Sequence, residues 1–146
     1  MGKKRERKSS TPAKTKAPSK ALPKKTSPKK PRYSEQAEQI KFFDWIRAQN
    51  DWRMGLAFAI PNEGKMPIYT RMRMKRAGVL PGVPDIFLAY ANNGYHGLFI
   101  EMKVKPNTVK ENQLFAMLEL NKRSFKCVVC WSADEAIEAV KAYVQE

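Results

Sequence analysis

The sequence is poor in the side chains that build zinc sites and disulfide frameworks. It contains two cysteines, Cys127 and Cys130, and His96 is its only histidine. A structural zinc site needs four such ligands, so zinc is not expected. Both cysteines lie in the apolar run 127–131, and we interpret them as small buried apolar side chains in a reducing compartment.

The sequence also lacks the segments that direct a chain into or across a membrane. No apolar run reaches the length of about 18 residues that a membrane-spanning helix needs. The basic N-terminus has no apolar stretch of the kind found in secretory signals. We therefore expect an intracellular protein with no membrane partner, and the choice between cytoplasm and nucleus stays open.

Acidic residues are almost absent from the first 33 residues. This segment holds 13 lysines and arginines, the single acid Glu6 and five prolines, and it carries most of the formal net charge of +14. A segment with so much charge and so little to bury is typical of disorder. We interpret residues 1–33 as a basic arm that binds nucleic-acid phosphates, or else as a tail for solubility or localisation. Residues 34–146 are long enough for one folded domain.

Two short apolar segments surround the residues with the clearest chemistry. Residues 85–90 and 97–104 are typical of strands with a turn between them, which predicts a hairpin. Because side chains alternate along a strand, Glu101 and Lys103 share one face. If the strands pair, Asp85 lies close to the end that carries both.

A charge near a core has to be paired or bound to a metal. Two neighbouring carboxylates, Asp85 and Glu101, repel each other unless a cation lies between them. Oxygen ligands without a histidine or cysteine cluster favour Mg²⁺ or Mn²⁺, which can activate a water and neutralise charge on a phosphate. Lys103 would then position or deprotonate that water. A structural ion pair between Glu101 and Lys103 on a half-solvated strand is the alternative that the spacing leaves open.

The same residues resemble a known nuclease signature. Pro84-Asp85, a hairpin and Glu101-Met102-Lys103 are similar to the PD-(D/E)XK nuclease superfamily. The chain from about Ser34 to the C-terminus resembles the VRR-NUC domains (virus-type replication-repair nucleases) in that superfamily. The segments that carry this resemblance, in order, are Ala59–Gly64, the basic run Arg71–Arg76, Gly78, Gly82–Asp85, Gly97–Lys103 and Gln113. One departure is the segment 102–107, where many relatives have a glycine-rich stretch, and it affects a loop rather than the catalytic positions.

The resemblance implies a metal-dependent nuclease. The catalytic residues that it implies are Asp85, Glu101 and Lys103. An acid from the first helix completes the metal site in the family, and we slightly favour Glu38 over Glu35, whose place at the helix start is explained by the helix dipole. The carbonyl of Met102 is a further expected ligand. The expected supporting residues are Asn62 and Gln113, and Gln113 would reach back toward the active strand.

A basic run comes directly before the hairpin. If residues 67–77 are helical, the helix starts near Pro67 and stops at Gly78. The cations of this run are Arg71, Arg73, Lys75 and Arg76. Because no acid occurs from Lys65 to Arg76, we expect this face to grip the DNA backbone near the cleavage site. The alternative is an ordinary solvated face.

The remaining segments complete an α/β pattern. Ser34 is expected to cap a helix that runs to about Gln49, and residues 55–60 to form a short buried strand. Capping boxes at 108–111 and 132–135 predict two more helices, with a strand at 126–131 between them. The buried face of the first of these helices is expected to consist of Leu114, Phe115, Met117, Leu118 and Leu120. The order α-β-α-β-β-α-β-α predicts a mixed central sheet flanked by helices, in agreement with the restriction-endonuclease-like core.

The expected function is that of a small Mg²⁺-dependent DNA endonuclease. Compact members of the resembled family look like structure-specific enzymes, and some act as dimers on four-way junctions. A branched DNA substrate and a Holliday-junction-resolvase-like role in DNA recombination or repair are therefore expected. A homodimer would place two active sites on two strands, but the sequence shows no heptad or apolar stripe for one. The alternatives are a flap, nicking or RNA-acting nuclease, or a non-catalytic DNA-binding protein on a nuclease scaffold.

Overall fold

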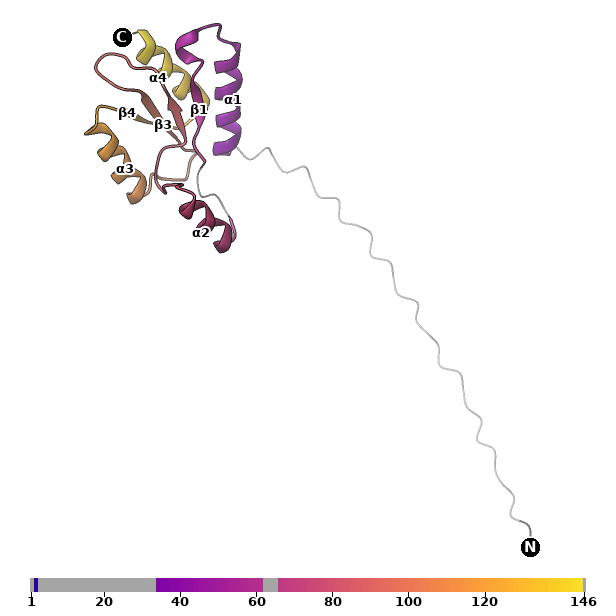
Figure 1. Cartoon of the computed structure of the whole chain (residues 1–146). Coiled ribbons are helices and arrows are strands. Elements are labelled where there is room, and N and C mark those ends of the chain that lie inside the picture. Colours follow the sequence, from indigo (N-terminus) through magenta and orange to yellow (C-terminus); the bar gives the residue numbers. More distant parts are fainter. Residues whose placement is uncertain (1, 3–33, 62–65, 146) are drawn as a thin grey trace. The chain divides into compact units, whose positions relative to one another are not determined.

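The computed structural model describes residue 2 and residues 34–61 and 66–145 (Figure 1). The basic arm predicted for residues 1–33 and the predicted supporting residue Asn62 lie outside the described residues, so both stay predictions. No helix in the described part of the chain is long and apolar enough to cross a membrane.

Four strands form one mixed sheet in the order β1-β2-β3-β4. The strands are β1 (Ala57–Ala59), β2 (Ile86–Leu88), β3 (Leu98–Met102) and β4 (Lys126–Cys130). The pairs β1–β2 and β2–β3 are antiparallel, whereas β4 runs parallel to β3. A parallel neighbour requires a crossover, which the helix between β3 and β4 supplies. The predicted mixed sheet with a central hairpin is therefore confirmed.

The helices follow the predicted order. They are α1 (Glu35–Ala48), α2 (Ile68–Arg76), α3 (Glu111–Asn121) and α4 (Ala133–Gln145), with a short 3-10 turn at Trp52–Met54. Ser34 caps α1 as expected, because its Oγ accepts a hydrogen bond of 3.1 Å from the backbone N–H of Ala37. Helix α3 starts two residues later than expected, with Lys110 rather than Thr108 at the cap position. Its first turn is closed by the side chain of Gln113, whose Oε1 accepts from the N–H of Lys110, and not by Thr108.

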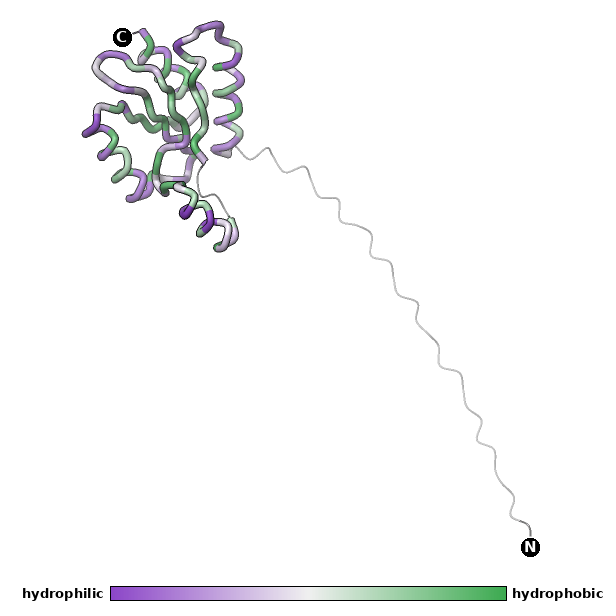
Figure 2. Tube along the Cα trace, viewed as in Figure 1, coloured by the Kyte–Doolittle hydropathy of each residue, from purple (hydrophilic) through white to green (hydrophobic). Residues whose placement is uncertain are grey.

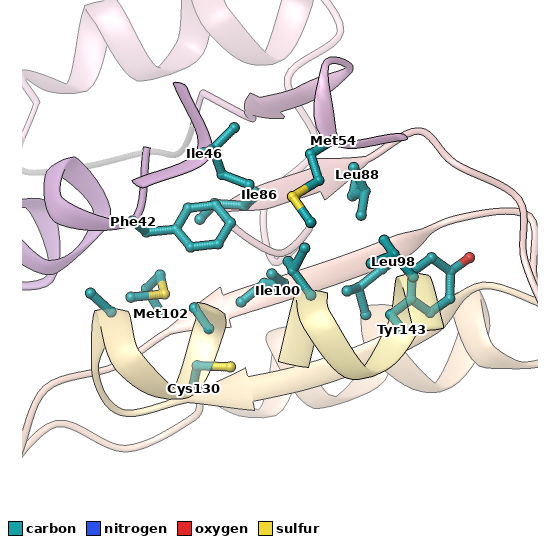
Figure 3. Packing of buried hydrophobic residues seen from close by; sticks show 14 residues of the cluster. Phe42, Ile46, Met54, Ile86, Leu88, Leu98, Ile100, Met102, Cys130 and Tyr143 are labelled. Carbon is teal, nitrogen blue, oxygen red and sulfur yellow. The ribbon is translucent and has the colours of Figure 1, made fainter. Parts of the chain in front are cut away.

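The core lies between one face of the sheet and the helices α1 and α4 (Figure 3). Alternate residues of β2 and β3 point into it, and the strands are predominantly hydrophobic in Figure 2. The fully buried strand residues of this core are Ile86, Leu88, Leu98, Ile100 and Met102. The opposite face carries Phe87 and Phe99, whose rings stack with centroids 4.4 Å apart. The strand alternation therefore places Glu101 and Lys103 on the face opposite the main core.

Two apolar surfaces are more exposed than the sequence predicted. β1 is an edge strand rather than a buried one, and the side chain of its Phe58 is 48% exposed. Helix α3 packs on β4 through one narrow side. Met117 is its only buried residue, while Leu114, Phe115 and Leu118 are exposed. The predictions of a buried β1 and a broad buried face on α3 were wrong, because in the described part of the chain no further layer covers these elements.

The segment between α2 and β2 passes the start of α3 with no room for a side chain. Gly82 has a φ of +90°, and a Cβ there would lie 2.6 Å from the backbone oxygen of Asn112. Gly78, in the same segment, has a φ of +96° but open space around it. Glycine at 82 therefore sets how closely the chain leading to Asp85 approaches α3.

These two glycines form a matched pair for a stability test. Gly78→Ala should cost about 1–2 kcal/mol, because only the left-handed backbone conformation penalises a side chain there. Gly82→Ala should cost about 1–3 kcal/mol more, because the new methyl group also overlaps backbone. Denaturant unfolding of both variants measures this difference. Equal losses would show that the contact between Gly82 and Asn112 does not constrain the fold.

Candidate active site

The hairpin brings together the three residues that the sequence predicted. Asp85 comes directly before β2, Glu101 lies in β3, and Lys103 follows β3. Because Ile86 pairs with Ile100, the residue before β2 faces the end of β3. The backbone N–H of Met102 donates a hydrogen bond of 2.9 Å to Oδ2 of Asp85. The expected position of Asp85 beside the Glu101–Lys103 end is confirmed.

Glu101 and Lys103 form a buried ion pair. Glu101 is fully buried and Lys103 is 5% exposed. The Lys103 ammonium donates to Oε1 of Glu101 and, over 3.2 Å, to the carbonyl of Met102. The Nε2 of Gln113, on α3, donates to the same carboxylate oxygen. Gln113 thus reaches back to the active strand, as the resemblance implied.

The other oxygen of this carboxylate lacks a protein partner. Oε2 of Glu101 is buried and accepts no hydrogen bond from the described residues. The pKa of Glu101 is raised to about 7, chiefly by burial; Lys103 opposes the rise, and the negative charges of Asp85 and Glu35 add to it. A buried carboxylate with open lone pairs and a raised pKa is poorly satisfied by the protein alone, and a cation would satisfy it.

Glu35 extends this site from the first turn of α1. Its Oε1 lies 3.9 Å from Nζ of Lys103. The same oxygen accepts a hydrogen bond of 2.9 Å from the side-chain amide of Asn107, in the loop after β3. Glu35 therefore faces the Glu101–Lys103 pair from a partly exposed position.

Glu38 faces a different part of the molecule. Its Oε2 accepts a hydrogen bond of 2.8 Å from the backbone N–H of Ala133 at the start of α4, and its Oε1 pairs with Lys41 over 2.7 Å. The bond from Ala133, followed by the one from Lys41, lowers the pKa of Glu38. The structure thus places Glu35, and not the slightly favoured Glu38, beside the predicted catalytic residues. No local pattern could have revealed this, because Ala133 is 95 residues away in the sequence.

The donor atoms of this site are few and consist of oxygen. Among the described residues, no three histidine, cysteine or acidic side chains form a ready-made metal cluster. The converging donors are the carboxylates of Asp85 and Glu101 and the carbonyl of Met102, with Glu35 at the edge. Mg²⁺ is commonly held by one or two carboxylates and keeps several waters. The unsatisfied Oε2 of Glu101 and this donor set fit such an ion.

The predicted basic helix is present as α2. Arg73, Lys75 and Arg76 are exposed, Arg71 is half-buried, and α2 has no buried residue. In residues 34–61 and 66–145, no carboxylate forms a salt bridge with the three exposed cations. Their availability agrees with the predicted role, and contact with DNA stays a prediction.

The two cysteines take no part in this chemistry. Both are free thiols, Cys130 buried and Cys127 partly buried. Burial raises the pKa of Cys127 to about 11 and that of Cys130 to about 12. Because the thiolate is the reactive form, neither is a nucleophile near neutral pH.

Comparison with known proteins points in the same direction as the geometry. The family model of the VRR-NUC domain matches residues 22–134. A solved structure described as a "VRR_NUC domain protein" superposes with a TM-score of 0.67 at 24% sequence identity, over 77% of this chain and 89% of that one. That likeness supports the fold. The comparison with curated proteins gave no match.

The two glutamates of α1 should differ in their effect on stability. Glu38→Ala should lower the free energy of unfolding by about 1–3 kcal/mol, because it leaves the N–H of Ala133 without its acceptor. Glu35→Ala should change it by less than about 0.5 kcal/mol, because Glu35 is partly exposed. Urea unfolding of both variants provides the measurement. A larger loss for Glu35→Ala would contradict the roles assigned to the two side chains.

The raised pKa of Glu101 predicts a pH effect on stability. Between about pH 4.5 and 7 the folded protein retains a proton that the unfolded chain releases, so this group's contribution to stability falls as the pH rises. Its slope is at most about 1.4 kcal/mol per pH unit. In EDTA, Glu101→Gln should therefore gain stability relative to wild type from pH 5 to pH 8. Exposed Glu138→Gln is the control, and a difference from wild type that does not change with pH would contradict the prediction.

Proposed function

The chain belongs to the VRR-NUC domain family of nucleases, in the PD-(D/E)XK superfamily, and on this premise we propose that it is a metal-dependent DNA endonuclease that hydrolyses phosphodiester bonds. The observation that carries the proposal is the buried Glu101, which is paired on one oxygen and unsatisfied on the other. Asp85 and Lys103 lie beside it. An isolated structural ion pair would have no need of that second carboxylate or of the unsatisfied oxygen.

Mg²⁺ or Mn²⁺ is the proposed cofactor. The residues that would hold it are Asp85, Glu101 and Met102, the last through its carbonyl, and Glu35 replaces Glu38 as the proposed acid from the first helix. Such an ion supplies charge neutralisation on the phosphate and a water of lowered pKa. The burial of Glu101 strengthens these electrostatic effects, because the surrounding dielectric is low.

Lys103 is the proposed residue that orients the attacking water. Its ammonium has three N–H donors, and two of them are directed at Glu101 and Met102. The third remains to bind the water or a phosphate oxygen. The oxygen of the oriented water bonds to phosphorus and gives up one proton to the surrounding water. At the same time the bond from phosphorus to the leaving sugar oxygen breaks, and that oxygen takes up a proton from the surrounding water. Gln113 holds the Glu101 carboxylate in place during this step.

DNA, and branched DNA in particular, is the proposed substrate. The cations of α2 come shortly before Asp85 in the chain, and we propose that they bind the phosphates of the substrate. A resolvase-like role in recombination or repair is the leading proposal, and a flap or nicking nuclease is the second. A homodimer that cuts two strands remains part of the resolvase proposal, and light scattering of the full chain would establish its mass.

The first experiment is a cleavage assay. Labelled four-way junction, flap, single-stranded and duplex DNA are incubated with the full chain in Mg²⁺, Mn²⁺ or EDTA. We expect cutting with either metal and none in EDTA, and a loss of at least about hundredfold in Lys103→Ala. Lys122→Ala, at an exposed lysine, is the matched control.

The outcomes separate the proposal from its rival. The DNA that is cut fastest identifies the substrate, and Glu35→Ala should lower the rate far more than Glu38→Ala. Tight, salt-sensitive binding without cutting under any metal would replace the endonuclease with a non-catalytic DNA-binding protein.

A further inference from the structure

Helix α2 stands apart from the sheet and from the helices that pack on it. Figure 1 shows it beyond the end of the sheet, and none of its residues is buried. Its inner side consists of the half-buried Thr70, Arg71 and Met74. A helix held by one side only presents most of its surface to solvent, and the composition of that surface indicates what it binds.

The outer face of α2 combines an aromatic ring, a thioether and two guanidinium groups. Tyr69, Met72, Arg73 and Arg76 have the spacing i, i+3, i+4, i+7, which places them on one face of a helix. Tyr69 is 72% exposed and Met72 60% exposed. We call these four residues the outer face of α2. Ile68, four residues before Met72 on the same helix, is also exposed, so α2 presents more than one apolar side chain to solvent.

The charge around the outer face of α2 restricts its partner. No acid occurs between Lys65 and Arg76, and in the described part of the chain neither Arg73 nor Arg76 has a carboxylate within salt-bridge distance. A second copy of this helix would bring like charges together. A polyanion would pair with the arginines, and flat apolar surfaces would pack against Tyr69 and Met72. Unpaired nucleotides offer both.

We propose that the outer face of α2 binds unpaired bases of the DNA substrate. Tyr69 stacks on a base, Met72 packs against its neighbour, and Arg73 and Arg76 bind the flanking phosphates. In a plain duplex the base faces are covered by stacking, so only the arginines find partners there. The face therefore distinguishes DNA with unpaired nucleotides from continuous duplex. This inference rests on the proposed nuclease function and adds the feature of the substrate that is recognised.

The connection to the active site is short and constrained. The segment 77–84 leads from α2 to Asp85, and within it Gly82 lies against Asn112, the neighbour of Gln113. Gln113 donates to Glu101. The helix that would hold a base is thus connected to Asp85 by a short segment, and close packing against α3 restricts the position of that segment.

The test measures how tightly the full chain binds two DNAs in EDTA. One is a Y-shaped DNA with two unpaired arms, the other is a plain duplex, and both have the same number of phosphates. A fluorescent base analogue in one unpaired arm reports stacking. Tyr69→Ala should weaken binding to the Y-shaped DNA by about tenfold and reduce quenching of the analogue, and it should leave duplex binding unchanged. Tyr69→Phe should behave as wild type, because the ring does the stacking.

Two further variants serve as controls. Phe115→Ala removes a ring that is almost equally exposed, at 67%, but lies on α3 without neighbouring arginines, and it should bind both DNAs as wild type does. Arg73→Gln with Arg76→Gln should weaken binding to both DNAs and reduce the dependence of binding on salt.

The inference is overturned if Tyr69→Ala weakens binding to both DNAs equally or to neither, or if Tyr69→Phe is as weak as Tyr69→Ala. It is also overturned if Tyr69→Ala changes the molar mass of the protein in solution, which would assign the face to a second copy. Cleavage is scored separately in Mg²⁺. Base-dependent binding without cleavage would remove the proposed nuclease function alone. Cleavage whose preference for Y-shaped DNA over plain duplex survives Tyr69→Ala would remove this inference alone.

Discussion

A buried carboxylate in β3 and a buried ammonium group directly after that strand are the constraint on which the site depends. Removing Glu101 and Lys103 from water is costly, and their mutual attraction offsets that cost only if further hydrogen bonds satisfy the pair. The chain supplies such bonds from α3, where Gln113 donates to Glu101, and from β3 itself, where the Met102 carbonyl accepts from Lys103. One carboxylate oxygen is still unsatisfied. The fold therefore maintains an incompletely satisfied charge where the proposed chemistry needs a cation.

On the first helix, two glutamates have different roles: Glu38 is structural, and Glu35 lies at the proposed site. Glu38 binds the start of α4 and joins the two helices that cover the core. Glu35, one turn earlier, reaches the edge of the site and contacts Lys103 and Asn107. The two residues are offset by only about 60° around the helix axis. What separates their roles is the different partner of each carboxylate, Ala133 for Glu38 and Asn107 for Glu35.

Exposed apolar residues occur on both α2 and α3, but their surroundings differ. On α2 they are interleaved with arginines and lysines, whereas the exposed side chains of α3 form an apolar stripe, Leu114, Phe115 and Leu118. The positive charge on α2 indicates what kind of partner it binds, because a cationic and aromatic face is complementary to nucleotides. On α3 no comparable charge pattern selects a partner.

The sequence by itself determined the local geometry of the site. Alternation along a strand places Glu101 and Lys103 on one face and Ile100 and Met102 on the other, and the turn between the strands brings Asp85 next to them, because these are consequences of backbone geometry over a few residues. The tertiary structure alone decided which glutamate of α1 faces the site and which residues of α3 and β1 are covered. Those outcomes depend on contacts between segments far apart in the chain, such as Glu38 with Ala133. The local sequence pattern shows which face of an element is apolar or charged. It does not show whether another part of the fold packs against that face.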